Sequence, residues 1–472
     1  MRNRALLLVL MLCLFPWCGS SKPKGGLIVA RSVFKEGPSP ATMLILRPGA
    51  EGWSREEVSV PPGKVVLQPG IGADGKSYVR RLGKEGEPPS KPLTFVRSGA
   101  GWTVAEAPGA SEKDITWAEV NGKPESKVFE LEGGNVFHKC MWFKPAFGEP
   151  GILTISANMP YLQIWREPGG SGTGFKAETL WTAVVGQREH RFRDVEAGDV
   201  DSDGQDELVV VTHDLGAVFV IEQTPQGMKP QEIYRDTQRT FTHEVEIGDV
   251  DGDKKLEFFT TPSAPNRLDG TPQGGRIDMY RWDGGSKTYV RTEVSRLPER
   301  HPKEILAVDL DGDGRVELYA AIETAGMKDP SQRLFIRGWA WKDGGMKEIG
   351  DVTLQGDMCR FLNTGDTDCD GAREIIASTR KNGIYVIQRK GGSWSVADVV
   401  PGSVSSGFEH ATVVFDWDGD GRDDIFVASD DQKKLRHFWL PKGQTTYQSE
   451  DIMDFQAEKY FIWNVMPLPP GK

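Results

Sequence analysis

Asp309-Leu310-Asp311-Gly312-Asp313-Gly314-Arg315-Val316-Glu317-Leu318 is an acidic stretch with carboxylates at offsets 0, 2, 4 and 8 from its first residue. Four other stretches repeat this pattern. The five begin at Asp199, Asp249, Asp309, Asp366 and Asp416, so successive copies lie 50, 60, 57 and 50 residues apart. Internal repeats of this length are typical of a β-propeller, in which each repeat forms one blade.

Each copy lies in the same local context. An apolar run precedes it, as at 305–308, and a β-rich run follows it, as at 208–211. A third apolar run, as at 218–221, and a polar alternating run, as at 288–294, complete the period. Four strands per period make a blade, so we expect an all-β fold built as a single β-propeller.

The number of blades follows from the spacing. Acidic-loop blades cover about residues 187–450, while degenerate blades without the loop cover about 26–186. Dividing the chain by the mean spacing favours eight blades, and seven remain if residues 110–134 are an insertion. The apolar segment 458–466 has no partner of its own, so we expect it to pair with the first blade and close the ring.

The acidic stretches predict metal sites. Carboxylates at these offsets, with a backbone carbonyl at offset 6, offer hard oxygen ligands that suit Ca²⁺. A glycine at offset 5 allows a sharp turn in every copy except the second, where Lys254 replaces it. Asp and Gly are also ordinary turn residues, but five copies at matching offsets favour up to five ions. The expected ligands are Asp199, Asp201, Asp203, Gln205 and Glu207; Asp249, Asp251, Asp253, Lys255 and Glu257; Asp309, Asp311, Asp313, Arg315 and Glu317; Asp366, Asp368, Asp370, Ala372 and Glu374; and Asp416, Asp418, Asp420, Arg422 and Asp424.

These loops resemble the FG-GAP/VCBS repeat family of calcium-loop β-propellers, which includes the integrin α-subunit head and many secreted bacterial proteins. The resemblance implies a propeller with bound calcium. It leaves the activity open, because the family includes adhesion modules, polysaccharide lyases and sugar dehydratases.

A second pattern lies six residues before each acidic loop, where Arg193, His243, Lys303, Arg360 and His410 stand. His138 occupies the matching position of a degenerate blade. We expect these residues to form a ring at the mouth of the channel opposite the calcium loops. The alternative is paired surface charge at the starts of strands.

This ring provides candidate catalytic residues and candidate ligand-binding residues. Imidazoles act as acids and bases near neutral pH or hold a transition metal, which makes a second metal an open alternative. The candidate catalytic residues are His243, His410, His190 and His138, and the candidate ligand-binding residues are Arg193, Lys303, Arg360, Glu409, His213 and Arg380.

The N-terminus and the composition limit location and partners. Residues 1–20 have the layout of a secretory signal peptide, and Cys18 is a candidate lipid-anchor site. We therefore expect an exported protein that is periplasmic, tethered to the outer membrane or extracellular, with no transmembrane segment. The net charge of −11 disfavours nucleic acid as a partner.

Two functions remain open. The first is a monomeric ligand-binding or scaffold module of the cell envelope, whose partner is an anionic glycan or another envelope or extracellular protein. The second is a carbohydrate-active lyase or dehydratase that uses the His/Arg ring.

Overall fold

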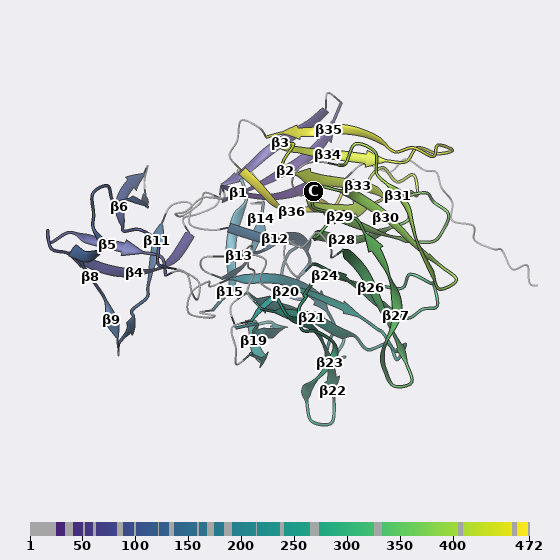
Figure 1. Ribbon diagram of the computed structural model, residues 1–472, viewed down its shortest axis with the longest axis horizontal. Helices are drawn as coiled ribbons and strands as arrows, with labels where there is room; N and C mark the ends of the chain where they lie inside the picture. The colour runs from purple at the N-terminus through teal and green to yellow at the C-terminus, as the bar shows by residue number, and fades with distance from the viewer. Residues whose placement is uncertain are drawn as a thin grey trace, which may run out of the picture.

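The computed structural model describes most of the chain after the N-terminal segment (Figure 1). The described residues are 25–33, 41–50, 52–59, 63–82, 88–98, 101–120, 122–131, 136–157, 160–167, 174–183, 191–213, 215–236, 240–264, 273–324, 333–404, 409–455 and 460–470. The predicted signal peptide and Cys18 lie outside them. No helix in this part of the chain is long and apolar enough to cross a membrane.

The described residues form an all-β structure in which seven sheets have four antiparallel strands each. Their strand orders are β36 (Tyr460–Leu468), β1 (Gly26–Val33), β2 (Ala41–Gly49), β3 (Gly52–Ser59); β12 (Val136–Phe143), β13 (Gly151–Ala157), β14 (Tyr161–Arg166), β15 (Lys176–Thr182); β16 (Phe192–Gly198), β17 (Glu207–Thr212), β18 (Val218–Thr224), β19 (Gly227–Tyr234); β20 (Phe241–Gly248), β21 (Glu257–Ser263), β22 (Gly275–Asp283), β23 (Thr288–Leu297); β24 (Pro302–Val308), β25 (Glu317–Ile322), β26 (Leu334–Lys342), β27 (Gly345–Leu354); β28 (Cys359–Gly365), β29 (Glu374–Thr379), β30 (Gly383–Lys390), β31 (Ser393–Val399); and β32 (Glu409–Phe415), β33 (Asp424–Ser429), β34 (Lys434–Trp439), β35 (Gln448–Asp454).

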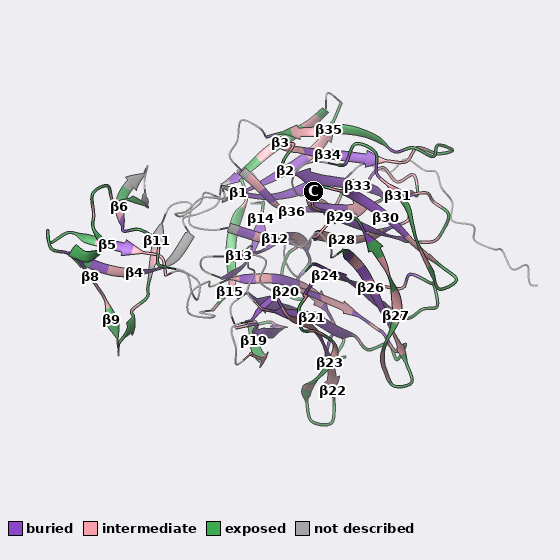
Figure 2. Ribbon diagram, in the orientation of Figure 1, coloured by how far each residue is buried: buried purple, intermediate pink, exposed green. Residues whose placement is uncertain are grey.

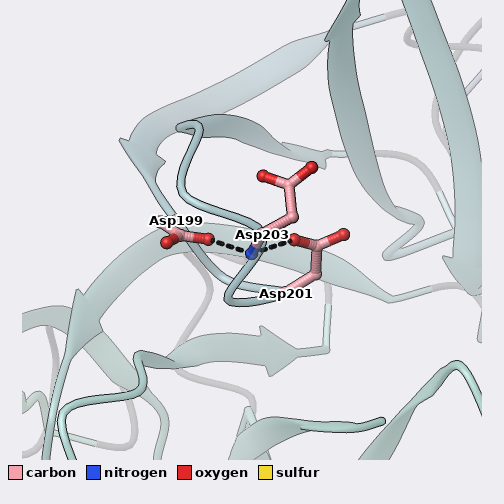
Figure 3. Close-up of side chains that lie close together, drawn as sticks. All are labelled: Asp199, Asp201 and Asp203. Atoms are coloured by element: carbon pink, nitrogen blue, oxygen red, sulfur yellow. Dashed lines mark hydrogen bonds between the residues drawn. The ribbon is translucent and has the colours of Figure 1, made fainter.

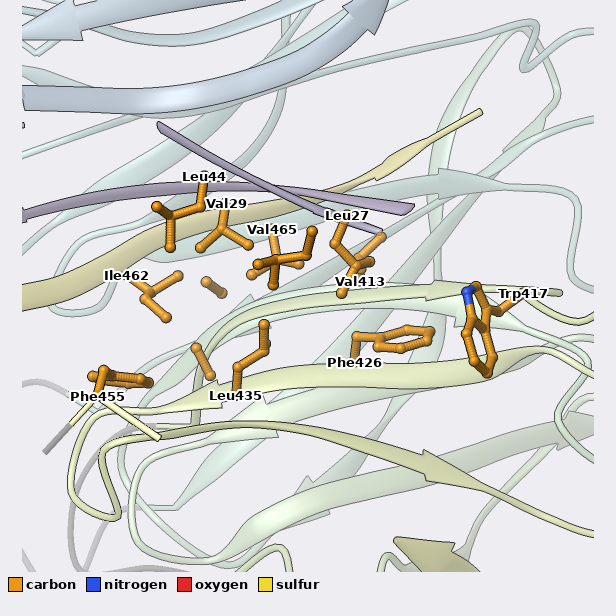
Figure 4. Packing of buried hydrophobic residues seen from close by; sticks show 13 residues of the cluster. Leu27, Val29, Leu44, Val413, Trp417, Phe426, Leu435, Phe455, Ile462 and Val465 are labelled. Carbon is orange, nitrogen blue, oxygen red and sulfur yellow. The ribbon is translucent and has the colours of Figure 1, made fainter. Parts of the chain in front are cut away.

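The sheets pack face to face, so their middle strands are apolar on both sides. Every residue of β17, β25, β29 and β33 is buried, whereas the outer strand β35 is largely exposed (Figure 2). The hydrophobic core is therefore divided among the interfaces between neighbouring sheets. Figure 4 shows one such interface, where Leu27 and Leu44 meet Phe426 and Leu435 of the last four-stranded sheet.

We call β36, β12, β16, β20, β24, β28 and β32 the inner strands. Each inner strand contacts the inner strand of the next sheet, and β36 contacts both β12 and β32. The C-terminal strand β36 pairs with β1, as the sequence predicted, with Val465 opposite Val29. The first and last parts of the chain thus share one sheet.

The segment between β3 and β12 differs from the prediction. It forms a sheet in the order β11-β4-β5-β6-β7, with β8 also paired to β4 and a separate hairpin β9–β10, and it lies to one side of the other sheets (Figure 1). The strands are β4 (Gly63–Gly72), β5 (Ser77–Arg80), β6 (Leu93–Ser98), β7 (Gly101–Glu106), β8 (Ile115–Trp117), β9 (Glu119–Val120), β10 (Lys123–Pro124) and β11 (Lys127–Leu131).

This side sheet has a small core of its own, made by Leu67, Val79, Leu93 and Val104. Trp53 lies in the β2–β3 hairpin of the first four-stranded sheet, whereas Trp102 lies in the β6–β7 hairpin of the side sheet. The expected eighth four-stranded unit is therefore absent from the described residues. The physical reason is that this segment has no continuous apolar strand to fill an interface between two blades.

Candidate functional site

The five acidic stretches are loops that connect an inner strand to the second strand of its sheet. Each loop is folded by its own carboxylates. The carboxylate at offset 8 accepts a hydrogen bond from the backbone N–H at offset 1, over 3.1 Å from Val200 to Glu207 and 2.9 Å from Leu310 to Glu317. The first aspartate accepts N–H groups further along the loop, as from Asp203 to Asp199 over 3.0 Å (Figure 3).

Three carboxylates converge in every loop, with oxygen atoms within 4.8 Å of one another. These groups are Asp199, Asp201 and Asp203; Asp249, Asp251 and Glu257; Asp309, Asp311 and Glu317; Asp366, Asp368 and Glu374; and Asp416, Asp418 and Asp420. The sequence predicted four carboxylates in each group, and the structure brings three together. At offset 6, the backbone N–H groups of Gln205, Lys255, Arg315, Ala372 and Arg422 donate to the carboxylate at offset 4.

The electrostatics of these loops favour a cation. Burial, with a further contribution from Asp201, raises the pKa of Glu207 to about 8. Burial likewise raises the pKa of Glu257, Glu317 and Glu374 to about 7. Desolvated carboxylates that face one another are costly unless a cation neutralises them, so this donor set fits a hard divalent ion.

The second loop holds an arginine closer to two of its convergent carboxylates than the third loop does, where Arg389 Nη1 lies 3.5 Å from Asp311 Oδ2 and 3.9 Å from Glu317 Oε1. Arg281, on the third strand of the same sheet, places Nη2 2.5 Å from Asp251 Oδ2 and Nε 3.0 Å from Glu257 Oε1. Lys254 also adopts φ 68°, at the offset where Gly314 provides the positive φ in the third loop. Only the pairing of second and third strands reveals Arg281, so the sequence pattern missed it.

In the fifth loop, His437 Nε2 lies 2.9 Å from Asp424 Oδ1. Asp424 thus faces an imidazole from the third strand, and it lies outside the convergent group of that loop.

The second site is a cavity of about 590 Å³ bordered by the inner strands. The predicted residues that border it are His138, Arg193, His213, His243, Lys303, Arg360 and Arg380. Arg191, Phe461 and Trp463 also border the cavity, although the sequence pattern did not indicate them.

A β-bulge in each inner strand explains this arrangement. The register of pairing skips one residue in five strands, two residues in β20, and one in the pairing of β36 with β1. The skipped residues are His138, Arg193, His243 with Glu244, Lys303, Arg360, Ala411 and Trp463. Bulges redirect side chains and often lie beside binding sites. Except for Ala411, every skipped residue borders the cavity.

The prediction for the last sheet falls partly outside the described residues. Its skipped residue is Ala411, while His410 pairs in register with Ala428. The side chains of Glu409 and His410, and the whole of His190, lie outside the described residues.

Carboxylates line the cavity beside the basic residues. Asp194 and Glu304 directly follow a bulge residue, and Glu244 belongs to the bulge of β20. Glu196 and Glu246 lie two residues after Asp194 and Glu244 and also border the cavity. Burial raises the pKa of Glu304 to about 8 and that of Glu244 well above its usual value. The cavity is therefore mixed in charge, whereas the sequence had emphasised its cations.

Some of these charges are paired. Lys139 Nζ lies 2.9 Å from Asp194 Oδ1 and also contacts Glu196. Arg193 lies 3.5 Å from Glu244, and Arg380 Nε donates to Asp357 over 3.0 Å.

The fold and the loops define a β-propeller-like all-β protein with acidic Asp-x-Asp-x-Asp turns. Residues 366–427 match the model of the FG-GAP-like repeat, which confirms the predicted resemblance to FG-GAP/VCBS repeats. A solved lectin from Agrocybe aegerita, described as recognising non-reducing terminal N-acetylglucosamine, is 13% identical with a TM-score of 0.43 over 96% of this chain and 97% of that one. Comparison with curated proteins gives no match.

Proposed function

We propose that this chain is an exported, calcium-stabilised propeller of seven blades that binds a ligand in the cavity between its inner strands. The cyclic order of contacts between inner strands supports a closed ring. Trp417 Nε1 also donates a hydrogen bond to Gly25 O over 2.9 Å, which ties the last acidic loop to the start of the described chain. In this proposal the side sheet is an insertion into a propeller of residues 21–472, preceded by a signal peptide at residues 1–20.

Calcium binding is supported by the convergent carboxylates. We expect four strong sites, because Arg281 forms close hydrogen bonds with Asp251 and Glu257 in the second loop, whereas Arg389 stays 3.5 Å or more from the carboxylates of the third loop. The coordinating groups would be the convergent carboxylates, and the ion would supply charge neutralisation that holds each loop.

The variants Asp309→Ala and Asp249→Ala test this difference. Both aspartates accept the N–H groups at offsets 3 and 5, over 2.7 and 2.8 Å at Asp309 and over 2.7 and 2.9 Å at Asp249. Asp309 accepts one further N–H, from Asp313 over 3.1 Å, so the two variants lose similar sets of hydrogen bonds. We expect Asp309→Ala to lose one bound Ca²⁺ by calorimetric titration and Asp249→Ala to lose none. Equal losses in the two variants would contradict the role given to Arg281.

The ligand site is supported above all by the bulges, because one irregularity repeated in successive inner strands aims basic side chains into one cavity. We propose an anionic glycan as the ligand, since Arg193, Lys303 and Arg360 suit carboxylate or sulfate groups. The protein would act as a binding module of the cell envelope.

This function is tested with an oligogalacturonate and a neutral oligosaccharide of equal length. The double variant Arg193→Ala/Arg360→Ala should weaken oligogalacturonate binding at least about tenfold, as expected from losing two charge-assisted contacts. Arg296→Ala, at an exposed arginine paired with Glu293, is the matched control and should bind as the wild type does. Equal affinity for the neutral oligosaccharide argues against an anionic ligand.

A second candidate function is a polysaccharide lyase or sugar dehydratase. The observation that favours it is the contact of Lys303 with His243 in the cavity, because an uncharged amine or imidazole can act as a general base. An enzyme would lose turnover of a uronic acid polymer in His243→Ala while its melting temperature stays unchanged.

A further inference from the structure

We propose that Lys303 and His243 form an uncharged pair that takes up a proton when an oxyanion binds among Arg193, Lys303 and Arg360. The oxyanion is a carboxylate or sulfate group of the ligand. This inference rests on the proposed function and specifies how the same cavity recognises charge.

The contact between the two side chains carries the proposal. Lys303 Nζ lies 3.0 Å from His243 Nδ1 and 3.2 Å from His243 Nε2. Both residues are almost completely buried, with 2% and 1% of their surface exposed. Two cations at this distance in a desolvated site would repel each other strongly, so an amine N–H donating to a neutral imidazole is the stable arrangement.

The surroundings add more positive than negative charge to the pair. Arg360 of β28, in the next sheet, and Arg193 of β16, in the sheet beyond that of β20, act on Lys303, and His213 and His301 lie beside His243. Glu323 and Glu304 are the nearby carboxylates, but among the described residues none forms an ion pair with Lys303. Glu323 instead lies 3.1 Å from His301 Nε2, and burial raises the pKa of Glu304.

The direction of the proton shift follows from these charges. Burial, then the charge of Arg360, lowers the pKa of Lys303 well below its usual value, and burial with the nearby Lys303 lowers that of His243. A bound anion beside Lys303 Nζ stabilises the protonated form of the amine, so the amine takes a proton from solvent. Because the free form binds fewer protons than the complex, anion affinity falls as pH rises, by up to about tenfold per pH unit for one proton.

The inference is tested with inorganic sulfate and the full chain, by calorimetry in HEPES and Tris buffers, whose enthalpies of ionisation differ. The wild type should take up close to one proton per sulfate near pH 8. Lys303→Arg keeps a permanent charge, so it should bind sulfate with little proton uptake, whereas Lys303→Met should lose most of the affinity. Lys229→Arg, at an exposed lysine paired with Glu222, is the matched control and should keep the wild-type uptake.

The outcomes separate this inference from the proposed function. Sulfate that binds without proton uptake, sulfate that fails to bind, or wild-type uptake in Lys303→Arg would each overturn the inference. Oligogalacturonate that binds without uptake would leave the binding function standing and the inference wrong. Uptake with sulfate in a protein that binds no glycan would support the inference and contradict the glycan ligand.

Discussion

A chain that ends at residue 457 is expected to give no soluble protein with cooperative unfolding. The deletion removes β36, which pairs with β1 from Tyr460 opposite Val33 to Leu468 opposite Gly26. It leaves the long apolar edge of β1 unpaired, and such edges promote aggregation. Thermal unfolding and size-exclusion chromatography of the truncated protein measure the effect.

The energetic cost comes from burial on both sides of β36. Ile462, Val465 and Leu468 are at most 3% exposed, and each contributes about 1.5–3 kcal/mol through burial. Asn464 Oδ1 also accepts a hydrogen bond from the backbone N–H of Cys140 on β12, over 3.0 Å. The deletion therefore leaves a buried N–H donor of the next sheet without this acceptor. These losses equal a large part of the stability of an ordinary domain.

A chain that ends at residue 468 provides the control, because it keeps all of β36. We expect this variant to unfold cooperatively at nearly the wild-type temperature. If the chain ending at residue 457 is soluble and unfolds in the same manner, β36 does not complete the ring.

The sequence predicts the repeated part of this fold well, because the same acidic pattern recurs five times at a similar spacing. The loop aspartates mark where each inner strand ends, so counting back six residues reaches Arg193, His243, Lys303 and Arg360, which border one cavity in the structure. The count shifted by one in the last sheet, where the bulge falls on Ala411. A bulge changes pairing without changing composition, so the spacing of residues alone does not reveal it.

Contacts that depend on pairing between distant strands were beyond the sequence pattern. Arg281 reaches the second acidic loop only because β22 pairs with β21. The side sheet was mistaken for a blade because its hairpins have the apolar and turn residues of any hairpin. What distinguishes it is the partner strand: β4 pairs with β11, which lies some 60 residues later in the chain.

Removal of Ca²⁺ with EGTA is expected to lower the melting temperature by on the order of 10 °C. Ligand binding to the folded state alone stabilises by about 2.7 kcal/mol per site when free ligand exceeds Kd a hundredfold. Four sites then contribute about 11 kcal/mol, and the unfolding entropy of a chain of this size converts that into a shift of this order. Scanning calorimetry in Ca²⁺, in EGTA and after Ca²⁺ is restored makes the measurement.

The physical source of the shift lies in the loops. Without an ion, buried groups such as Glu207 and Glu317 either remain charged beside other carboxylates or bind protons, and both states cost free energy. Mg²⁺ at the same concentration is the control, because it requires a smaller and more rigid octahedral site. A melting curve that EGTA leaves unchanged would mean that the loops are held by their own N–H groups and by Arg281, Arg315 and Lys390, with no contribution from calcium.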